Sequence, residues 1–178
     1  MPMRHLSFLL LLTLATAPSF AEETDTAPAD TLVAFSLPDQ FDATHTDQEL
    51  RGRVALVMWA DRKGNDHRSR WTRILARELD DEITTGQVRP ILVAHLDGVP
   101  GFIKGRVMKR FKQEDAPALL DWEGMFAANY GLAPDHLNLL VFDADGRLVH
   151  EAAATRLDQD LLDEVLAAVA AAIADGPP

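Results

Sequence analysis

One unbroken run of six apolar residues, Val54–Trp59, constrains the fold of this chain more than any other feature. A strand with one face in water alternates apolar and polar residues, so a run without polar residues predicts a strand covered on both faces. The stretch that follows, Asn65–Asp80, is patterned as a helix, and either Asn65 or Asp66 is a suitable N-cap. The apolar residues of this stretch stand at helical spacing: Trp71, Ile74, Leu75 and Leu79. We therefore expect a buried strand followed by a helix that packs against it.

The remainder of the chain repeats the alternation of strand and helix. Further strands are predicted at 31–37, 88–96, 118–121, 137–142 and 147–152. Further helices are predicted at 103–111, 125–130 and 157–174, and a loop with one helical turn at 47–50 is predicted over 39–53. Such alternation requires a partly parallel sheet covered on both faces, and the Asp143–Gly146 hairpin turn adds antiparallel strands. The sequence thus predicts one α/β domain over residues 31–175, with a mixed central sheet and helices on both faces.

The N-terminal end has the pattern of an export signal. Arg4 supplies a positive charge, residues 6–14 form a short apolar run, and Ser19-Phe20-Ala21 resembles a cleavage site. The apolar run is shorter than the roughly 20 residues that a membrane-spanning helix needs. We therefore expect residues 1–21 to be a signal peptide and residues 22–30 to be an acidic linker. The mature protein is then periplasmic or secreted, without a stable membrane anchor.

Charge is distributed unevenly along the chain. The formal net charge is −11, yet residues 51–112 carry 14 basic and only 7 acidic side chains. The acidic total argues against a nucleic-acid-binding protein, whose domain is normally basic. The basic middle third can still form a local anion-attracting surface if the fold gathers it.

Cysteine is absent from the sequence. Its absence excludes disulfides, a thiolate nucleophile, a thiol peroxidase and a cysteine-ligated zinc ion or iron–sulfur cluster. The six histidines show no spacing typical of a zinc motif. His95 and Asp97 share one face of a predicted strand, but two groups make an incomplete site, so we expect no metal and no cofactor.

Three stretches resemble the thioredoxin-like superfamily, and within it the peroxiredoxin-like (AhpC/TSA-type) branch. Residues 35–40 and 50–60 are similar to that branch's F-x-L-x-D-Q followed by L-x-G-K-x-V-L-V-x-F-W-A. Residues 118–132 are similar to P-x-L-L-D-x-x-G … A-x-x-Y-G-V, and residues 139–149 resemble x-F-L-I-D-x-D-G-K-I-V. Together the three stretches span most of residues 33–175 in the right order. The resemblance implies a thioredoxin-like three-layer sandwich.

Two departures from the family pattern bear on function. The family's active thiols follow the Trp-Ala that ends the first core strand, whereas here Trp59-Ala60 is followed by Asp61-Arg62-Lys63-Gly64-Asn65-Asp66. The family also has a cis-proline just before the strand that precedes the Asp-x-Asp-Gly turn, and alignment on Asp143 puts Leu137 near that position. No redox residue therefore carries over. A narrower likeness is to YtfJ-like periplasmic proteins, which share the exported start, the Pro100-Gly101-Phe102 segment and the hairpin, and it implies no established substrate.

The loop that stands in place of the thiols is the first candidate site. It lies where a helix follows a core strand, and free backbone N–H groups and the helix dipole favour anions at such a place. The candidate ligand-binding residues are Asp61, Arg62, Lys63, Asp66 and Arg68. The functional interpretation is a site for a carboxylate, a phosphate or an acidic partner peptide. The alternative is a solvated loop whose acids and bases pair with each other.

A second basic segment covers residues 104–112, where five basic side chains occur without an acidic one. They stand opposite an apolar stripe at helical spacing, formed by Ile103, Val107 and Phe111. A basic amphipathic helix can rest on anionic lipid or on an acidic protein surface. The alternative is an ordinary surface helix whose positive charge compensates the acidic remainder of the chain. The candidate partner-binding residues are Lys104, Arg106, Lys109 and Arg110.

These observations favour an exported thioredoxin-like domain without redox cysteines that works by binding. Its partner is an unknown protein or a small anionic ligand, and no residue is assigned a catalytic role. The alternative is an enzyme that uses Asp61, Asp66, His67 or His95 in acid–base or metal-assisted chemistry. Thiol–disulfide or peroxide chemistry would need a partner that supplies every thiol.

Overall fold

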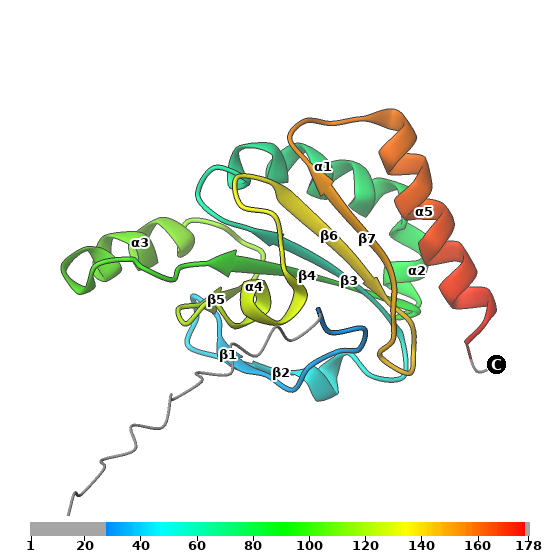
Figure 1. Cartoon of the computed structure of the whole chain (residues 1–178), viewed down its shortest axis with the longest axis horizontal. Coiled ribbons are helices and arrows are strands. Elements are labelled where there is room, and N and C mark those ends of the chain that lie inside the picture. Colours follow the sequence, from blue (N-terminus) through cyan, green and yellow to red (C-terminus); the bar gives the residue numbers. More distant parts are fainter. Residues whose placement is uncertain (1–27, 177–178) are drawn as a thin grey trace, which may run out of the picture.

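The computed structural model describes residues 28–176, and its centre is a five-stranded sheet in the order β5-β4-β3-β6-β7 (Figure 1). The strands are β3 (Val54–Ala60), β4 (Val88–His95), β5 (Ala118–Asp121), β6 (Leu137–Phe142) and β7 (Leu148–Ala154). β3, the middle strand, pairs in parallel with β4 and antiparallel with β6. β5 continues the parallel half and β7 the antiparallel half. The mixed sheet expected from the sequence is confirmed, with the apolar run in its central strand.

The sheet is covered on both faces, which gives three layers (Figure 1). Helices α1 (Asn65–Glu78) and α5 (Gln159–Ala174) pack on one face. Helix α4 (Met125–Tyr130) and a hairpin of β1 (Ser36–Pro38) and β2 (Thr44–Thr46) cover the other. The remaining elements are short: α2 (Asp80–Thr84), α3 (Lys104–Phe111) and 3-10 turns at Asp47–Glu49 and Gly101–Ile103. The α/β sandwich predicted from the sequence is therefore observed.

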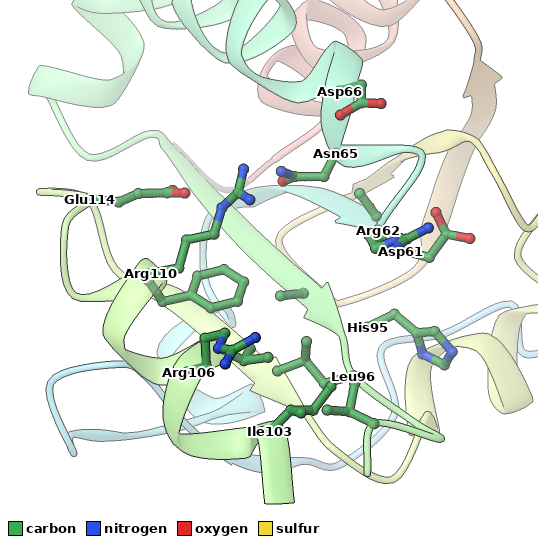
Figure 2. A pocket seen from close by; sticks show the side chains of 15 residues that line it. Asp61, Arg62, Asn65, Asp66, His95, Leu96, Ile103, Arg106, Arg110 and Glu114 are labelled. Carbon is green, nitrogen blue, oxygen red and sulfur yellow. The ribbon is translucent and has the colours of Figure 1, made fainter.

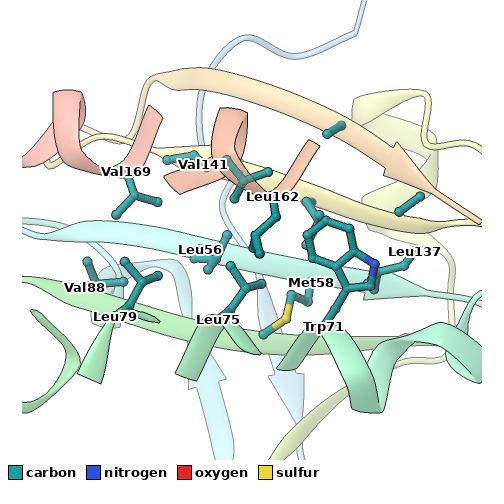
Figure 3. Packing of buried hydrophobic residues seen from close by; sticks show 14 of the residues in the cluster. Leu56, Met58, Trp71, Leu75, Leu79, Val88, Leu137, Val141, Leu162 and Val169 are labelled. Atoms are coloured by element: carbon teal, nitrogen blue, oxygen red, sulfur yellow. The ribbon is translucent and has the colours of Figure 1, made fainter. Parts of the chain in front are cut away.

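Alternate residues of β3 enter two different cores. Leu56 and Met58 face α1 and α5, where they meet the fully buried Trp71 (Figure 3). Val57 and Trp59 enter the second core on the α4 side. Removing a large apolar side chain from water stabilises a fold by about 1.5–3 kcal/mol. Since β3 is held from both sides in this way, its C-terminal end presents the following loop from a rigid position.

The strand predicted at 31–37 is shorter than expected. β1 begins at Ser36, and Thr31 makes only an isolated bridge to Arg147. The hydroxyl of Tyr130 accepts a hydrogen bond from the N–H of Val33 (2.8 Å) and donates one to the carbonyl of Thr31 (3.1 Å). Because a side chain of α4 satisfies these backbone groups, the segment needs no partner strand.

Other boundaries also differ from the prediction. The predicted N-cap of α1 at Asn65 or Asp66 is wrong, because Gly64 occupies that position and no side chain caps the helix. The loop predicted at 39–53 contains the short strand β2 as well as the expected helical turn. The last helix begins two residues later than predicted, because the carboxylate of Asp158 caps it.

His45 on β2 ties the hairpin to the neighbouring 3-10 turn. Its Nε2 lies 3.1 Å from Asp39 Oδ2, and its Nδ1 lies 3.0 Å from Glu49 Oε2. The other oxygen of the buried Asp39 accepts hydrogen bonds from the N–H groups of Phe41 (2.8 Å) and Ala43 (3.0 Å). Burial lowers the pKa of His45, but the hydrogen bonds to Glu49 and Asp39 outweigh it and hold the pKa of His45 above its ordinary value.

The N-terminal predictions fall mostly beyond the described part of the chain. The signal peptide predicted at 1–21 and most of the linker predicted at 22–30 lie outside residues 28–176. Within that range the chain passes beside α4, where the N–H of Ala29 donates to the carbonyl of Asn129 (2.7 Å). None of the helices in residues 28–176 has the length and apolar character needed to cross a membrane.

Candidate functional site

A cleft of about 390 Å³ opens at the C-terminal ends of β3 and β4. One wall is the loop after β3, residues 61–66, and the other wall is α3 (Figure 2). The two segments that the sequence analysis singled out therefore line the same cleft. Its volume lies within the range of about 300–1,000 Å³ that is typical of small-molecule pockets.

The inner surface of the cleft is largely apolar. Its apolar lining comes from the strand ends and from the segment that includes α3: Ala60, Ala94, Leu96, Val99, Ile103, Val107 and Phe111. Ile103, Val107 and Phe111 recur every four residues, so they share one side of the helix. All three are half-buried, and no residue of α3 is fully buried. The cleft thus retains apolar surface that a ligand can cover.

Three arginines stand around this apolar surface. Arg62 comes from the loop, and Arg106 and Arg110 come from α3 (Figure 2). All three are exposed, and none takes part in an ion pair within residues 28–176. A guanidinium group binds a carboxylate or phosphate through two parallel hydrogen bonds. The cleft therefore offers three cations to an anionic ligand.

Asp61 is the structural centre of the loop rather than a free acid. Its Oδ1 accepts hydrogen bonds from the N–H groups of Lys63 (2.9 Å) and Gly64 (2.8 Å), and its Oδ2 accepts one from the N–H of Asp135 (2.8 Å). Burial raises the pKa of Asp61, but these three donors outweigh it, and the pKa lies below its ordinary value. A carboxylate with both oxygens engaged and a lowered pKa is a poor general base.

Glu114, just beyond α3, is also engaged. Arg68 of α1 donates to both of its carboxylate oxygens (2.8 and 2.7 Å). The side chain of Gln40 holds the same segment by donating to the carbonyl of Ala116 (2.8 Å). Among the described residues that line the cleft, Asp66 is thus the one carboxylate without a hydrogen-bond or ion-pair partner, whereas three lining arginines have no ion-pair partner. The balance of free charge in the cleft is positive.

The N-terminus of α1 does not offer the free N–H groups expected from the sequence. The N–H of Asn65 donates to the carbonyl of Asp61 (3.0 Å), and the N–H of Asp66 donates to the carbonyl of Lys63 (3.1 Å). The next N–H along the helix is bonded within the turn in the same way. Recognition of an anion here therefore depends on the arginine side chains.

Gly64 lets the loop pack against the segment that precedes β6. A Cβ at this position would lie 2.0 Å from the carbonyl oxygen of His136. No peptide bond within residues 28–176 is cis, and Leu137, expected near the family's cis-proline position, is the first residue of β6. The close approach of the two backbones fixes the loop, and Arg62 with it, relative to the sheet.

The structure brings five of the nine candidate residues to the cleft and leaves four elsewhere. The five are Asp61, Arg62, Asp66, Arg106 and Arg110, and the four are Lys63, Arg68, Lys104 and Lys109. Lys63 forms an ion pair with Asp135 (2.7 Å), and Lys104 lies over the ring of Trp122, 4.6 Å from its centroid. Lys109 is exposed on the outside of α3.

Several residues of the cleft have roles that depend on distant contacts and could not be predicted from the sequence. Glu114 anchors the end of α3 to Arg68, 46 residues away in the sequence. Its one sequence signal is its place as the first acid after the basic segment. Leu96 and Val99 line the cleft only because α3 folds back toward the sheet, and no pattern in the sequence indicates that.

His95 does not form an acid–base pair with Asp61 or Asp66. His95 lines the cleft, but its ring lies 5.0 Å from the ring of Trp59, and Figure 2 shows it directed away from α3. Its Nδ1 is buried and has no hydrogen-bond partner among the described residues. Within residues 28–176 no three His, Asp or Glu side chains are grouped so that they could hold a metal ion.

No protein-family model and no curated protein matches this sequence. Solved structures do match its fold. A putative thiol:disulfide interchange protein, DsbE, from Chlorobium tepidum superposes with a TM-score of 0.59 at 18% identity, over 80% of this chain and 97% of that one. The exposed lipoprotein thioredoxin Etrx1 from Streptococcus pneumoniae gives 0.57 at 17% identity, over 76% and 99%. The chain has a thioredoxin-like fold.

A third neighbour of this thioredoxin-like chain is the peroxidoxin BcpB from Mycobacterium tuberculosis. It superposes with a TM-score of 0.55 at 23% identity, over 82% of this chain and 97% of that one. The predicted thioredoxin-like and peroxiredoxin-like resemblance is therefore confirmed at the level of the fold. The thioredoxin-like protein differs from redox members in having no cysteine anywhere in its sequence. The narrower likeness to YtfJ-like proteins stays a prediction.

Proposed function

We propose that this thioredoxin-like protein is exported and functions by binding an anionic ligand in the cleft between loop 61–66 and α3. The observation that carries the proposal is the convergence of Arg62 with Arg106 and Arg110 around one cavity. These arginines come from two segments that are separate in the sequence, and they have no ion-pair partner within residues 28–176. A fold alone does not specify function, whereas the residues of a site can.

The electrostatics of the cleft support an anion as the ligand. Since Asp61 and Glu114 are engaged by other donors, the cleft is lined by three guanidinium groups and one free carboxylate. The apolar lining lowers the local screening of charge, which strengthens an ion pair formed there. A charge-assisted hydrogen bond contributes about 1.5–3 kcal/mol. Loss of one should therefore weaken binding by about tenfold to a hundredfold.

Binding rather than turnover is supported by the chemistry of the loop. The redox function of related proteins requires thiols, and this chain has none. Asp61 accepts hydrogen bonds from backbone donors, and His95, which also lines the cleft, has a ring directed away from α3 (Figure 2). The proposal therefore assigns the cleft a ligand and assigns no residue a catalytic role.

Export is supported by the N-terminal sequence and by one neighbour that is described as an exposed lipoprotein. We expect cleavage after Ala21. N-terminal sequencing of protein recovered from the extracytoplasmic fraction should then begin at Glu22. Recovery only from the cytoplasm, with residues 1–21 retained, would contradict export.

Ligand binding is tested by a charge-reversal variant with a matched control. Arg106→Glu/Arg110→Glu removes two cations from the cleft, while Arg70→Glu/Arg73→Glu makes the same change in net charge at exposed positions of α1 away from it. Thermal shift against a panel of carboxylates and phosphate esters should show stabilisation of the wild type and of the control. The Arg106→Glu/Arg110→Glu variant should show no such stabilisation by these ligands. Equal loss in both variants would mean that net charge alone attracts the anions.

A further inference from the structure

We infer that the ligand is an amphiphile, with one acidic head group attached to a hydrocarbon body. The inference rests on the proposed function, because it names the class of ligand for the same cleft. It comes from the way cations and apolar side chains alternate along α3. Arg106 and Arg110 are each followed directly by an apolar lining residue, Val107 and Phe111. A ligand held by these arginines therefore also contacts apolar surface.

The floor of the cleft provides room for a hydrocarbon. Ala60 and Ala94 are paired neighbours in the register of β3 and β4, and both line the cleft. Two adjacent alanines leave a hollow on the sheet that larger side chains would fill. Val107 and Phe111 line the same cleft from α3. A ligand that covers these groups gains the free energy of removing apolar surface from water.

The backbone around the cleft does not favour a peptide. The N–H of Leu96 already donates to the carbonyl of Asp121 (2.8 Å), and the N–H of Val99 donates to the carbonyl of Leu96 (3.2 Å). The N–H groups of residues 63–66 are bonded within the turn as well. An extended peptide would therefore face apolar side chains with unpaired amides, each of which costs about 1–3 kcal/mol. A hydrocarbon body carries no such groups.

The head group is met by cations from both walls. Arg62 lines the cleft from the loop, and Arg106 and Arg110 line it from α3 (Figure 2). A carboxylate and a phosphate monoester both match the planar donors of arginine. This chemistry is shared by a free fatty-acid-like carboxylate and by the head group of an anionic membrane lipid, and the experiment separates the two sources.

The test is calorimetric titration of the purified protein with acetate, octanoate, decanoate and dodecanoate below their micelle concentrations, and with decanol as the uncharged analogue. We expect affinity to increase by about fourfold for each added methylene that the cleft buries. Decanol should bind at least about tenfold more weakly than decanoate, because it forms no charge-assisted hydrogen bond. Vesicles containing phosphatidylglycerol provide the membrane arm. If the protein co-sediments with these vesicles and the Arg106→Glu/Arg110→Glu change abolishes this, the ligand is a lipid head group. If the protein binds decanoate but does not co-sediment, the ligand is a free amphiphile.

Two variants separate the apolar part of the site from the charged part. Val107→Ser keeps all three arginines and should reduce the gain in affinity per methylene. Arg106→Glu/Arg110→Glu should weaken decanoate binding by about tenfold or more, and Arg70→Glu/Arg73→Glu should leave it unchanged. These positions are not fully buried, so the variants should fold, which circular dichroism verifies.

The outcomes distinguish the inference from the proposed function. Equal affinity for acetate and decanoate would overturn the inference while anion binding in the cleft stands. A preference for a short acidic peptide, such as tetraglutamate, over decanoate would do the same. No binding of any anion would overturn the inference and the proposed function together.

Discussion

Replacing Gly64 with alanine tests how the loop of the cleft is held in place. The new Cβ would lie 2.0 Å from the carbonyl oxygen of His136 and 2.5 Å from its carbonyl carbon. Both are backbone atoms, so no side chain can rotate away, and the loop or the start of β6 has to shift. Overpacking of this kind costs about 1–3 kcal/mol. In a chain of this size each kcal/mol lowers Tm by about 2–4 °C, so we expect a loss of about 2–12 °C.

Gly105→Ala is the matched control. A Cβ at Gly105 would meet nothing within 4 Å, and this glycine lies inside α3, where alanine is favoured over glycine by about 1 kcal/mol. Thermal melts and urea unfolding should therefore show unchanged or slightly higher stability for this control. Gly64→Ala should also bind decanoate more weakly, because Arg62 moves with the loop. A Gly64→Ala protein that melts and binds like the wild type would refute the packing described for the loop.

The remaining predictions concern a pH-dependent contact and an anchor. The pKa of His45 is raised by its two carboxylate partners despite burial, so its contribution to stability is complete below its ordinary value of 6.5 and is lost as the pH rises through the raised value. Burial raises the pKa of Asp39, but its hydrogen bonds outweigh burial and leave the pKa below its ordinary value. The hydrogen bond to His45 lowers the pKa of Glu49. The contributions of both carboxylates to folding stability are therefore lost in acid. Urea unfolding should show a larger deficit of His45→Gln at pH 5.5 than at pH 8.5, and equal deficits would contradict this. Arg68→Ala frees Glu114 and should cost about 1 kcal/mol after allowance for solvent screening, with faster amide exchange in α3; unchanged exchange would show that this pair is no anchor.

The parts of the fold that were predictable are those in which local pattern and burial agree. The run Val54–Trp59 has no polar residue, and it forms the central strand because both of its faces are covered. The helix at Met125–Tyr130 and the strand at Leu137–Phe142 occur at the predicted bounds. The strand predicted at 31–37 was too long because the Tyr130 hydroxyl, about a hundred residues away, forms hydrogen bonds with backbone groups of this segment. Sequence pattern carries no signal of such a long-range contact.

The candidate site was predictable in position but not in detail. Charge density indicated the two segments that line the cleft, and strand-to-helix order placed the loop at the end of the central strand. Which cations are free depends on partners far away in the chain. Lys63 does not line the cleft, and its ammonium group pairs with Asp135, 72 residues on. The helix N-terminus was wrongly expected to offer free donors, because Asp61 and the turn itself engage them.

The central claim is that loop 61–66 and α3 bind one anion together. Amide chemical shifts of the ¹⁵N-labelled protein, followed by NMR during a decanoate titration, test it residue by residue. The account predicts that shifts at residues 61–66 and 103–111 saturate along the same curve, with one Kd. Shifts confined to one of these segments, or two segments that saturate with different Kd values, would contradict it.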